Sequence, residues 1–376
     1  MKIGVFINCH VGHGGAERRF ARAVSQLSEI DNEVYLISNK ETAGVLLKKG
    51  YISESTNKLT FSGGVLKHGL FYKCYHFLNF YKLFILCLKK DIKHIHYPVD
   101  PSIYSFLHFL FFRFLGVGYS VSIVDSSRTD RKDFGIVRWL IWYYSIKYAK
   151  GVDFLSEGIK KNMEKVFHLQ IYNGSKVISV SPCSFTNYQD GKYSEDKEYD
   201  LVMMSRLHEK KGHFLFLDAL KYIEKEGRAS EIGRVGIFGS GKLEKDILKK
   251  IAELEEIKVE LSYTDNPFEI LSKTKILLSL QDDENYPSQS ILEAYSCGAK
   301  VIVTNVGESY KVVCPGYGAL VEKRPDVLGD SILYELESFD RIGADKIYNV
   351  VRSYLIKHHS IDRFVNYFSI FLKSQI

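Results

Sequence analysis

Two basic side chains stand out in residues 205–212, which read Ser-Arg-Leu-His-Glu-Lys-Lys-Gly. Arg206 presents a planar fork that matches phosphate oxygens, and Lys211 presents a mobile point charge. Because both belong to one loop after an apolar run, they can reach the same diphosphate. A solvated basic turn has the same composition, and the spacing alone does not choose between the two interpretations.

A polar segment, residues 281–298, reads Gln-Asp-Asp-Glu-Asn-Tyr-Pro-Ser-Gln-Ser-Ile-Leu-Glu-Ala-Tyr-Ser-Cys-Gly. Its loop ends in Ser288, Gln289 and Ser290, whose free amides would stand at a helix start, where anions bind. Glu293 follows about one turn later, and its carboxylate can accept two hydrogen bonds from a ribose diol. An exposed helix glutamate is the alternative. The preceding loop and the following Ala-x-x-x-Gly pattern favour a binding role.

Two glycine-rich turns lie where a strand is expected to pass into a helix. Gly14 and Gly15 follow the first apolar run, and Gly239 and Gly241 follow a run in the second half of the chain. Glycine lets the backbone turn tightly and approach a ligand closely, and the helix start beyond it favours anions. A simple strand-to-helix turn explains such glycines equally well. The first turn also lacks the GxGxxG spacing of a dinucleotide fingerprint.

The strands and helices that position these motifs are predicted from short apolar runs that alternate with longer amphipathic ones. In the first half these runs predict strands 2–8, 33–38, 92–97, 119–124, 152–155 and 176–180, with helices 16–28 and 136–149. In the second half they predict strands 200–204, 235–239, 258–261, 276–280 and 300–304, with helices 214–226, 243–254, 268–273 and 290–297. Strands that alternate with helices predict an α/β fold with parallel sheets.

Length and composition set the class of protein. A chain of 376 residues exceeds what one core usually serves, so two domains are expected, with a linker in the polar stretch 187–198. The formal net charge of +6 comes without a basic arm or zinc-finger spacing, so nucleic acid is not an expected partner. The six cysteines form no CxxC pair, which argues against a disulfide framework or zinc site and favours the reducing cytoplasm.

Two stretches in the first half, residues 70–88 and 104–115, resemble membrane segments. Charged residues interrupt the first, and the second is too short to span a bilayer, which takes about 20 apolar residues. Helices packed on a sheet are therefore favoured, and peripheral contact with a membrane is the alternative.

The ordered set GGAER, SRLxxxKG, FGSG and NYPSQSILEAYSCG resembles the family-4 retaining glycosyltransferases of the GT-B fold. It is most similar to the bacterial branch that builds capsule, O-antigen or exopolysaccharide. The resemblance covers nearly the whole chain and implies two Rossmann-like, doubly wound domains that face each other across a cleft. Residues 1–190 would bind the acceptor, with a C-terminal helix 361–376 packed back on them, and residues 197–355 would bind the nucleotide-sugar.

The resemblance also implies roles for single residues. Arg206 and Lys211 would hold the donor diphosphate as catalytic cations, and Glu293 would bind the ribose. The donor-binding set comprises Gly14, Gly15, Gly239, Gly241, Asn285, Ser288, Gln289, Ser290 and Glu293.

Two positions depart from the family pattern. Counting back from Glu293 places Asn285 where the family's first glutamate touches the donor sugar, and Glu284 is its neighbour. Val124 stands where many relatives have a histidine close to the transferred sugar, so Asp125 is the third catalytic candidate.

The implied function is retaining transfer of a sugar from a nucleotide-sugar donor to a glycan or lipid-linked glycan in surface polysaccharide synthesis. Such transfer depends on charge stabilisation more than on a strong base, so neither a metal nor another cofactor is expected. A carboxylate metal site at residues 282–284 is a disfavoured alternative, because the Glu293 motif already explains this loop.

The acceptor is expected in the first half, whose aromatic helices would rest on the cytoplasmic face of the membrane. The residues that suggest this contact are Phe71, Phe77, Phe80, Phe84, Trp139 and Trp142, with Lys73, Lys82 and Arg138. Two other functions stay open: a sugar-nucleotide 2-epimerase of the same fold, and a non-catalytic partner in a polysaccharide assembly complex. The departures at Asn285 and Val124 keep the second of these open.

Overall fold

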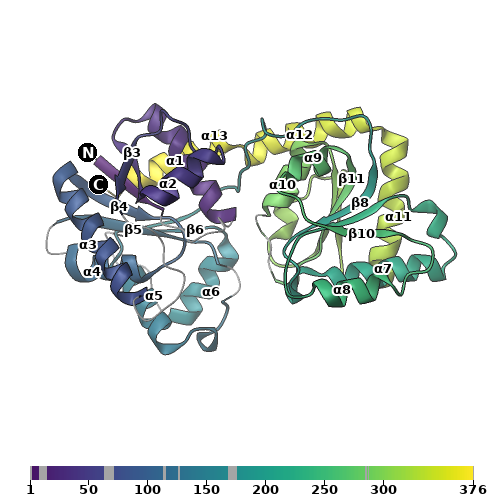
Figure 1. Cartoon of the computed structure of the whole chain (residues 1–376), viewed down its shortest axis with the longest axis horizontal. Helices are drawn as coiled ribbons and strands as arrows, with labels where there is room; N and C mark the ends of the chain where they lie inside the picture. The colour runs from purple at the N-terminus through teal and green to yellow at the C-terminus, as the bar shows by residue number, and fades with distance from the viewer. Residues whose placement is uncertain are drawn as a thin grey trace. The chain divides into compact units, whose positions relative to one another are not determined.

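The chain forms two compact units, each built around a parallel sheet (Figure 1). The computed structural model describes residues 2–7, 15–62, 72–112, 116–125, 128–167, 176–283, 286 and 288–375. Unit 1 comprises Met1–Cys183 and Asp362–Ile376, and unit 2 comprises Ser184–Ile361. The polar stretch 187–198 lies within unit 2, where Tyr188 accepts a hydrogen bond from Arg352 at 2.9 Å through its carbonyl oxygen.

The sheet of unit 1 has seven parallel strands in the order β3-β2-β1-β4-β5-β6-β7. They are β1 Lys2–Phe6, β2 Val34–Asn39, β3 Lys58–Phe61, β4 Ile92–Tyr97, β5 Gly118–Ile123, β6 Gly151–Phe154 and β7 Val177–Val180. The helices are α1 Gly15–Ile30, α2 Lys40–Lys48, α3 Tyr72–Lys90, α4 Ile103–Phe111, α5 Ile136–Tyr148, α6 Glu157–Phe167 and α13 Ile361–Lys373. The sequence did not predict the edge strand β3, whose four residues are mostly half-buried and carry little periodic signal.

The central strands of unit 1 have one apolar face and one polar face, because successive side chains alternate across a sheet. Ile95 and Val121 belong to the apolar core that α3 to α6 cover. His96 and Asp153 lie on the opposite face, where the Phe368 ring of α13 packs with its centroid 5.1 Å from that of His96. Helix α13 therefore covers the polar face of the sheet in unit 1, although it follows unit 2 in the sequence (Figure 1).

The sheet of unit 2 has six parallel strands in the order β10-β9-β8-β11-β12-β13. They are β8 Tyr199–Met204, β9 Val235–Phe238, β10 Val259–Ser262, β11 Thr274–Ser279, β12 Lys300–Thr304 and β13 Gly318–Val321. The helices are α7 His213–Lys225, α8 Glu244–Ile251, α9 Pro267–Ser272, α10 Gln289–Ser296, α11 Pro325–Ile342 and α12 Ala344–His359. Both faces of this sheet are apolar: Leu201 and Met203 join the core with α7 and α11, whereas Val202 joins the core with α10 and α12.

The two hydrophobic stretches of unit 1 form helices that pack on its sheet, as the sequence predicted. Phe80 and Trp142 are buried, so their expected contact with a membrane surface is wrong, whereas Phe77 is exposed. Phe71 lies outside the described residues. Among the described helices, none is both long enough and apolar enough to cross a membrane.

Candidate functional site

The strand order of the second sheet reverses between β8 and β11. After β8 the chain adds β9 and β10 on one side, and it then returns to place β11 on the other side of β8. The two strands pair in parallel, with Val202 opposite Leu277, so their carboxyl ends emerge side by side. Ligands of open α/β sheets bind at such a reversal, beyond the carboxyl ends of the strands. The loops that leave β8 and β11 carry the two motifs that the sequence singled out.

Polar contacts join these two loops directly. Lys210 Nζ lies 2.8 Å from Asp283 Oδ2, and the Lys210 carbonyl accepts a hydrogen bond from the Asp282 amide at 3.0 Å. Lys323 Nζ lies 3.3 Å from Asp282 Oδ1. Both aspartates of residues 282–284 therefore have lysine partners, which gives them a role in holding the loops together. Glu284, the third acid of this run, lies outside the described residues.

The loop after β8 approaches the end of β11 so closely that only glycine fits at one position. Gly212 has φ 79° and stands at the N-terminus of α7. A Cβ atom at this position would lie 2.0 Å from the carbonyl oxygen of Leu280. The glycine of the SRLxxxKG motif therefore allows the two loops to pack closely against each other.

The glycines of the FGSG turn also pack against backbone. A Cβ atom at Gly239 would lie 1.9 Å from the Ser205 carbonyl oxygen, and one at Gly241 would lie 2.4 Å from that of Leu207. The Leu207 amide in turn donates to the Ser240 carbonyl at 3.0 Å. These glycines bring the turn after β9 against the loop after β8, so their positions have a structural reason independent of any ligand.

Arg206 and Lys211 form a pair of neighbouring cations. Lys211 Nζ donates to Gln281 Oε1 at 2.5 Å, and Arg206 is exposed. Burial lowers the pKa of Lys211, and the positive charge of Arg206 lowers that pKa further. Within the part of the chain that the structure describes, neither cation forms an ion pair. Two close cations that form no ion pair with a described residue suit a polyanionic ligand.

Gln281 is a site residue that sequence reasoning did not select. Its side chain accepts the Lys211 hydrogen bond, and its carbonyl oxygen accepts from Thr304 Oγ1 at 2.7 Å, which ties the end of β12 to the loop. Its position in the sequence could have identified it, because it follows shortly after the buried strand β11.

Helix α10 begins with the polar residues that the sequence assigned to donor binding. Ser288 occupies the N-cap position, with its hydroxyl 2.9 Å from that of Ser290. Gln289 Nε2 donates to the Phe185 carbonyl at 2.7 Å, so its side chain ties α10 to the start of unit 2. Glu293 is only 7% exposed, and the alternative of an exposed helix glutamate is therefore wrong.

Two aspartates of unit 1 follow the carboxyl ends of its strands. Asp125 follows β5 and forms an ion pair with Arg128. Asp100 follows β4, and its carboxylate accepts hydrogen bonds from the amides of Val124 at 2.8 Å and of Asp125 at 3.2 Å. Gly15 is the first residue of α1. Gly14 and Asn285 lie outside the described residues.

Asp100 was also missed by sequence reasoning, although it stands just behind the predicted strand 92–97. It adopts a left-handed backbone with φ 53°, which is uncommon for a residue other than glycine. Burial raises its pKa to about 7, against the opposing effect of the Val124 amide. Strained backbone and a shifted carboxyl pKa together are typical of functional positions.

Comparison with known proteins agrees with the geometry of unit 2. Residues 185–339 match the family described as Glycosyl transferases group 1. The matched residues make up most of unit 2. They include both loops of the site, with Arg206, Lys211 and Glu293. No curated protein matches the sequence.

Solved structures resemble the whole chain. Anabaena Alr3699/HepE, in complex with UDP and glucose, has 14% identity and a TM-score of 0.72, with 100% of both chains covered. The sucrose-phosphate synthase of Thermosynechococcus elongatus has 13% identity and a TM-score of 0.74, with 99% of this chain and 98% of that chain covered. WaaG, a glycosyltransferase involved in lipopolysaccharide biosynthesis, has 12% identity and a TM-score of 0.67, with 98% and 99% covered. The expected fold class, two Rossmann-like α/β domains of the GT-B type, is confirmed.

Proposed function

We propose that this chain transfers a sugar from a nucleotide-sugar donor to a glycan or lipid-linked glycan, with retention of the anomeric configuration. The observation that carries the proposal is the pair Arg206 and Lys211, two cations without an ion-pair partner among the described residues, at the strand reversal of a glycosyltransferase domain. Structures of the similar HepE hold UDP and UDP-glucose, which supports a uridine nucleotide as the donor class.

The chemistry of such a transfer suits these side chains. When the bond between sugar and diphosphate breaks, negative charge grows on the leaving diphosphate, and each positioned donor can lower the barrier by about 3 kcal/mol. The diphosphate would also raise the pKa of Lys211, because its negative charge opposes the effects of burial and of the Arg206 charge, which both lower that pKa. The positive end of α10 would add a fixed dipole, and Glu293 would accept the ribose hydroxyls.

In the same proposal unit 1 holds the acceptor, and Asp125 contributes there as the third catalytic residue. The transfer needs no metal, since the two cations neutralise the leaving group. The reaction would belong to surface polysaccharide synthesis on the cytoplasmic side of a membrane, with unit 1 in peripheral contact with the lipid. Exposed apolar side chains on α3 and α5, among them Leu78, Tyr81, Ile136 and Leu140, support that contact.

The test is a titration of the full chain with UDP, UDP-glucose and UDP-N-acetylglucosamine by calorimetry. Arg206→Ala, Lys211→Met and Glu293→Gln are each expected to weaken binding 10-fold to 100-fold, since a charge-assisted hydrogen bond contributes about 1.5–3 kcal/mol. Lys249→Met is the matched control, because this lysine is 80% exposed on α8 and outside the site. Circular dichroism confirms that each variant folds. Equal affinity in all variants would refute the site.

A second measurement distinguishes the proposed sugar transfer from the two alternative functions, a 2-epimerase and a non-catalytic binding partner. Incubation with the bound nucleotide-sugar and a membrane extract as acceptor source, followed by NMR of the product, should show an anomeric coupling that matches the donor. Formation of an epimer without acceptor would instead identify a 2-epimerase, and tight nucleotide binding with neither product would identify a binding partner.

A further inference from the structure

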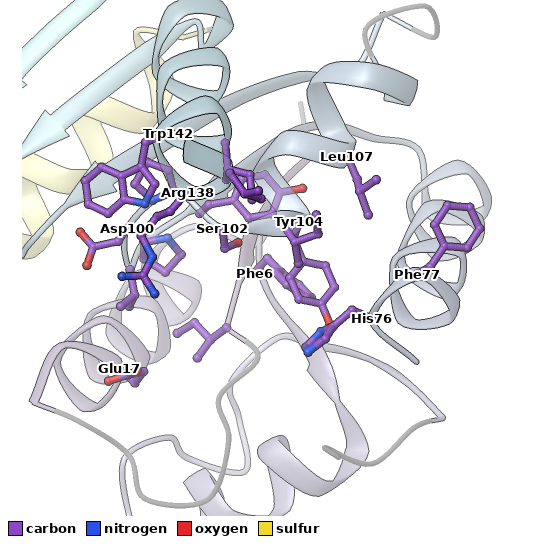
Figure 2. Close-up of a pocket in the computed structure, with 18 of the residues that line it drawn as sticks. Phe6, Glu17, His76, Phe77, Asp100, Ser102, Tyr104, Leu107, Arg138 and Trp142 are labelled. Atoms are coloured by element: carbon purple, nitrogen blue, oxygen red, sulfur yellow. The ribbon is translucent and has the colours of Figure 1, made fainter. Parts of the chain in front are cut away.

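Unit 1 contains a cavity of about 1210 Å³ that the donor site does not use (Figure 2). Phe6 and Ile7 at the end of β1 line it together with residues 97–104 at the end of β4. The strand order of the first sheet reverses between these two strands, since β2 and β3 lie on one side of β1 and β4 lies on the other. The cavity thus occupies the place in unit 1 where an open α/β sheet binds ligands.

The two ends of the cavity differ in chemistry. Figure 2 draws Asp100, Arg138 and Trp142 at one end, and Phe77 and Leu107 at the other. Charged residues of both signs, Asp100, Glu17 and Arg138, line the wall, so a neutral polar group fits the polar end better than an anion. Carboxylate and guanidinium groups bind the hydroxyls of a sugar, which both donate and accept hydrogen bonds.

The rest of the wall offers little to a polar ligand. It is made mainly of aliphatic and aromatic side chains from α3, α4 and α5. Of its polar groups, His76 Nδ1 and the Tyr104 hydroxyl lie 2.7 Å apart and form a hydrogen bond with each other. A glycan chain along this wall would lose its hydrogen bonds to water and gain none in return. A hydrocarbon chain forms no hydrogen bonds with water, so it loses none on entering.

The apolar lining continues onto the surface at the mouth. Ile136 and Val137, at the start of α5, line the cavity and are 82% and 72% exposed. Exposed apolar side chains that border an apolar cavity mark a place where a hydrophobic ligand enters.

We propose that this cavity binds a sugar-headed amphiphile, with the sugar at the Asp100 and Arg138 end and a hydrocarbon chain along the wall of α3 to α5. The inference rests on the proposed function and specifies its acceptor as a lipid-linked sugar. A cavity larger than the roughly 300–1,000 Å³ of ordinary small-molecule sites has room for such a bipartite ligand.

The test uses hexyl, octyl and decyl β-glucosides, each below its micelle concentration, titrated into the full chain by calorimetry. Each methylene that enters the cavity should raise the affinity about fourfold, so two methylenes should raise it about 15-fold. Glucose and a maltohexaose should bind far more weakly than decyl glucoside. Affinity that does not change with chain length, or maltohexaose that binds as tightly as decyl glucoside, would overturn the proposal.

A pair of surface variants locates the binding. Ile136→Glu places a charge at the mouth and should weaken octyl glucoside binding at least 10-fold. Ile30→Glu is the matched control, because Ile30 is 73% exposed at the end of α1 and does not line the cavity. Equal losses in both variants would also overturn the proposal.

Titration with UDP separates this inference from the proposed function. Both variants should keep the wild-type affinity for UDP, which is expected to bind to unit 2. Glucoside binding without UDP binding would refute the donor proposal and leave the amphiphile site standing. UDP binding without any glucoside binding would refute the amphiphile site alone.

Discussion

At the scale of single residues, Asp100 shows how surroundings change the behaviour of an ordinary side chain. Its carboxyl lies at the polar end of the cavity in unit 1, and burial raises its pKa to about 7. In the unfolded chain the pKa of an aspartate is about 3.9. Between these two values the folded protein holds a proton that the unfolded chain has released, so the free energy of unfolding falls as the pH rises through this window.

Asp100→Asn should remove this pH dependence. The asparagine oxygen can still accept from the Val124 and Asp125 amides, and asparagine tolerates a left-handed backbone. Compared with wild type, the variant should gain roughly 1–3 kcal/mol of stability between pH 4 and pH 8, a range that allows for the partial exposure of the group. Urea unfolding at several pH values measures this difference. Wild-type and variant profiles that run parallel would show that Asp100 ionises normally.

At the scale of elements, the proposed donor site depends on two loops that meet only because β8 and β11 are neighbours. Lys210, Lys211 and Gly212 all contact residues 280–283, by an ion pair, a hydrogen bond and close backbone packing respectively. The cations therefore stand on a loop whose position is set by another strand.

Gly212→Ala should disturb the packing of the loop after β8 against the end of β11. The added Cβ would lie 2.0 Å from the Leu280 carbonyl oxygen, and the residue would also keep the unfavourable φ of 79°. Gly227→Ala is the matched control, because its φ is 69° and no atom lies within 4 Å of the added Cβ. The control should cost about 1–2 kcal/mol, and Gly212→Ala should cost at least about 2 kcal/mol more and weaken UDP binding. Both are measured by urea unfolding and calorimetry. Equal costs would mean that the loop moves aside freely.

At the scale of the whole molecule, the chain returns to its first unit after completing the second. Helix α13 packs on the polar face of the first sheet, where the Tyr367 hydroxyl donates to Asp153 Oδ1 at 2.5 Å and lies 2.7 Å from the Ser179 hydroxyl. Lys373 Nζ lies 2.8 Å from Asp31 Oδ2. Without α13, the buried polar groups of this face would lose hydrogen-bond partners and become exposed to solvent.

Deletion of residues 362–376 should therefore destabilise unit 1 selectively. Hydrogen exchange should rise in β4, β5 and β6, while the amides of β8 to β12 stay protected and UDP affinity is unchanged. Tyr367→Phe is the milder counterpart, with an expected loss of about 1.5–3 kcal/mol for a hydrogen bond to a carboxylate. Faster exchange in both units after the deletion would show that their stabilities are coupled.

Much of the fold could be predicted from apolar periodicity, since it depends on neighbouring residues in the chain. The predicted runs 92–97, 200–204 and 300–304 correspond to β4, β8 and β12. The edge strands β3 and β13 were missed, whereas the edge strands β7 and β10 were predicted as the runs 176–180 and 258–261. Four residues at a partly exposed sheet edge carry only a weak periodic signal, which does not identify every such strand.

By itself, the sequence determined most of the strands, the parallel α/β class and the two motifs that follow β8 and β11. Only the tertiary structure decided which residues have partners and which are buried. Lys210 has an acidic partner and Lys211 a neutral one, although the two are neighbours in the chain. Trp142 is buried and Ile136 is exposed on the same helix. The reason is physical: burial, pairing and pKa depend on atoms that come from distant parts of the sequence, which local patterns do not contain.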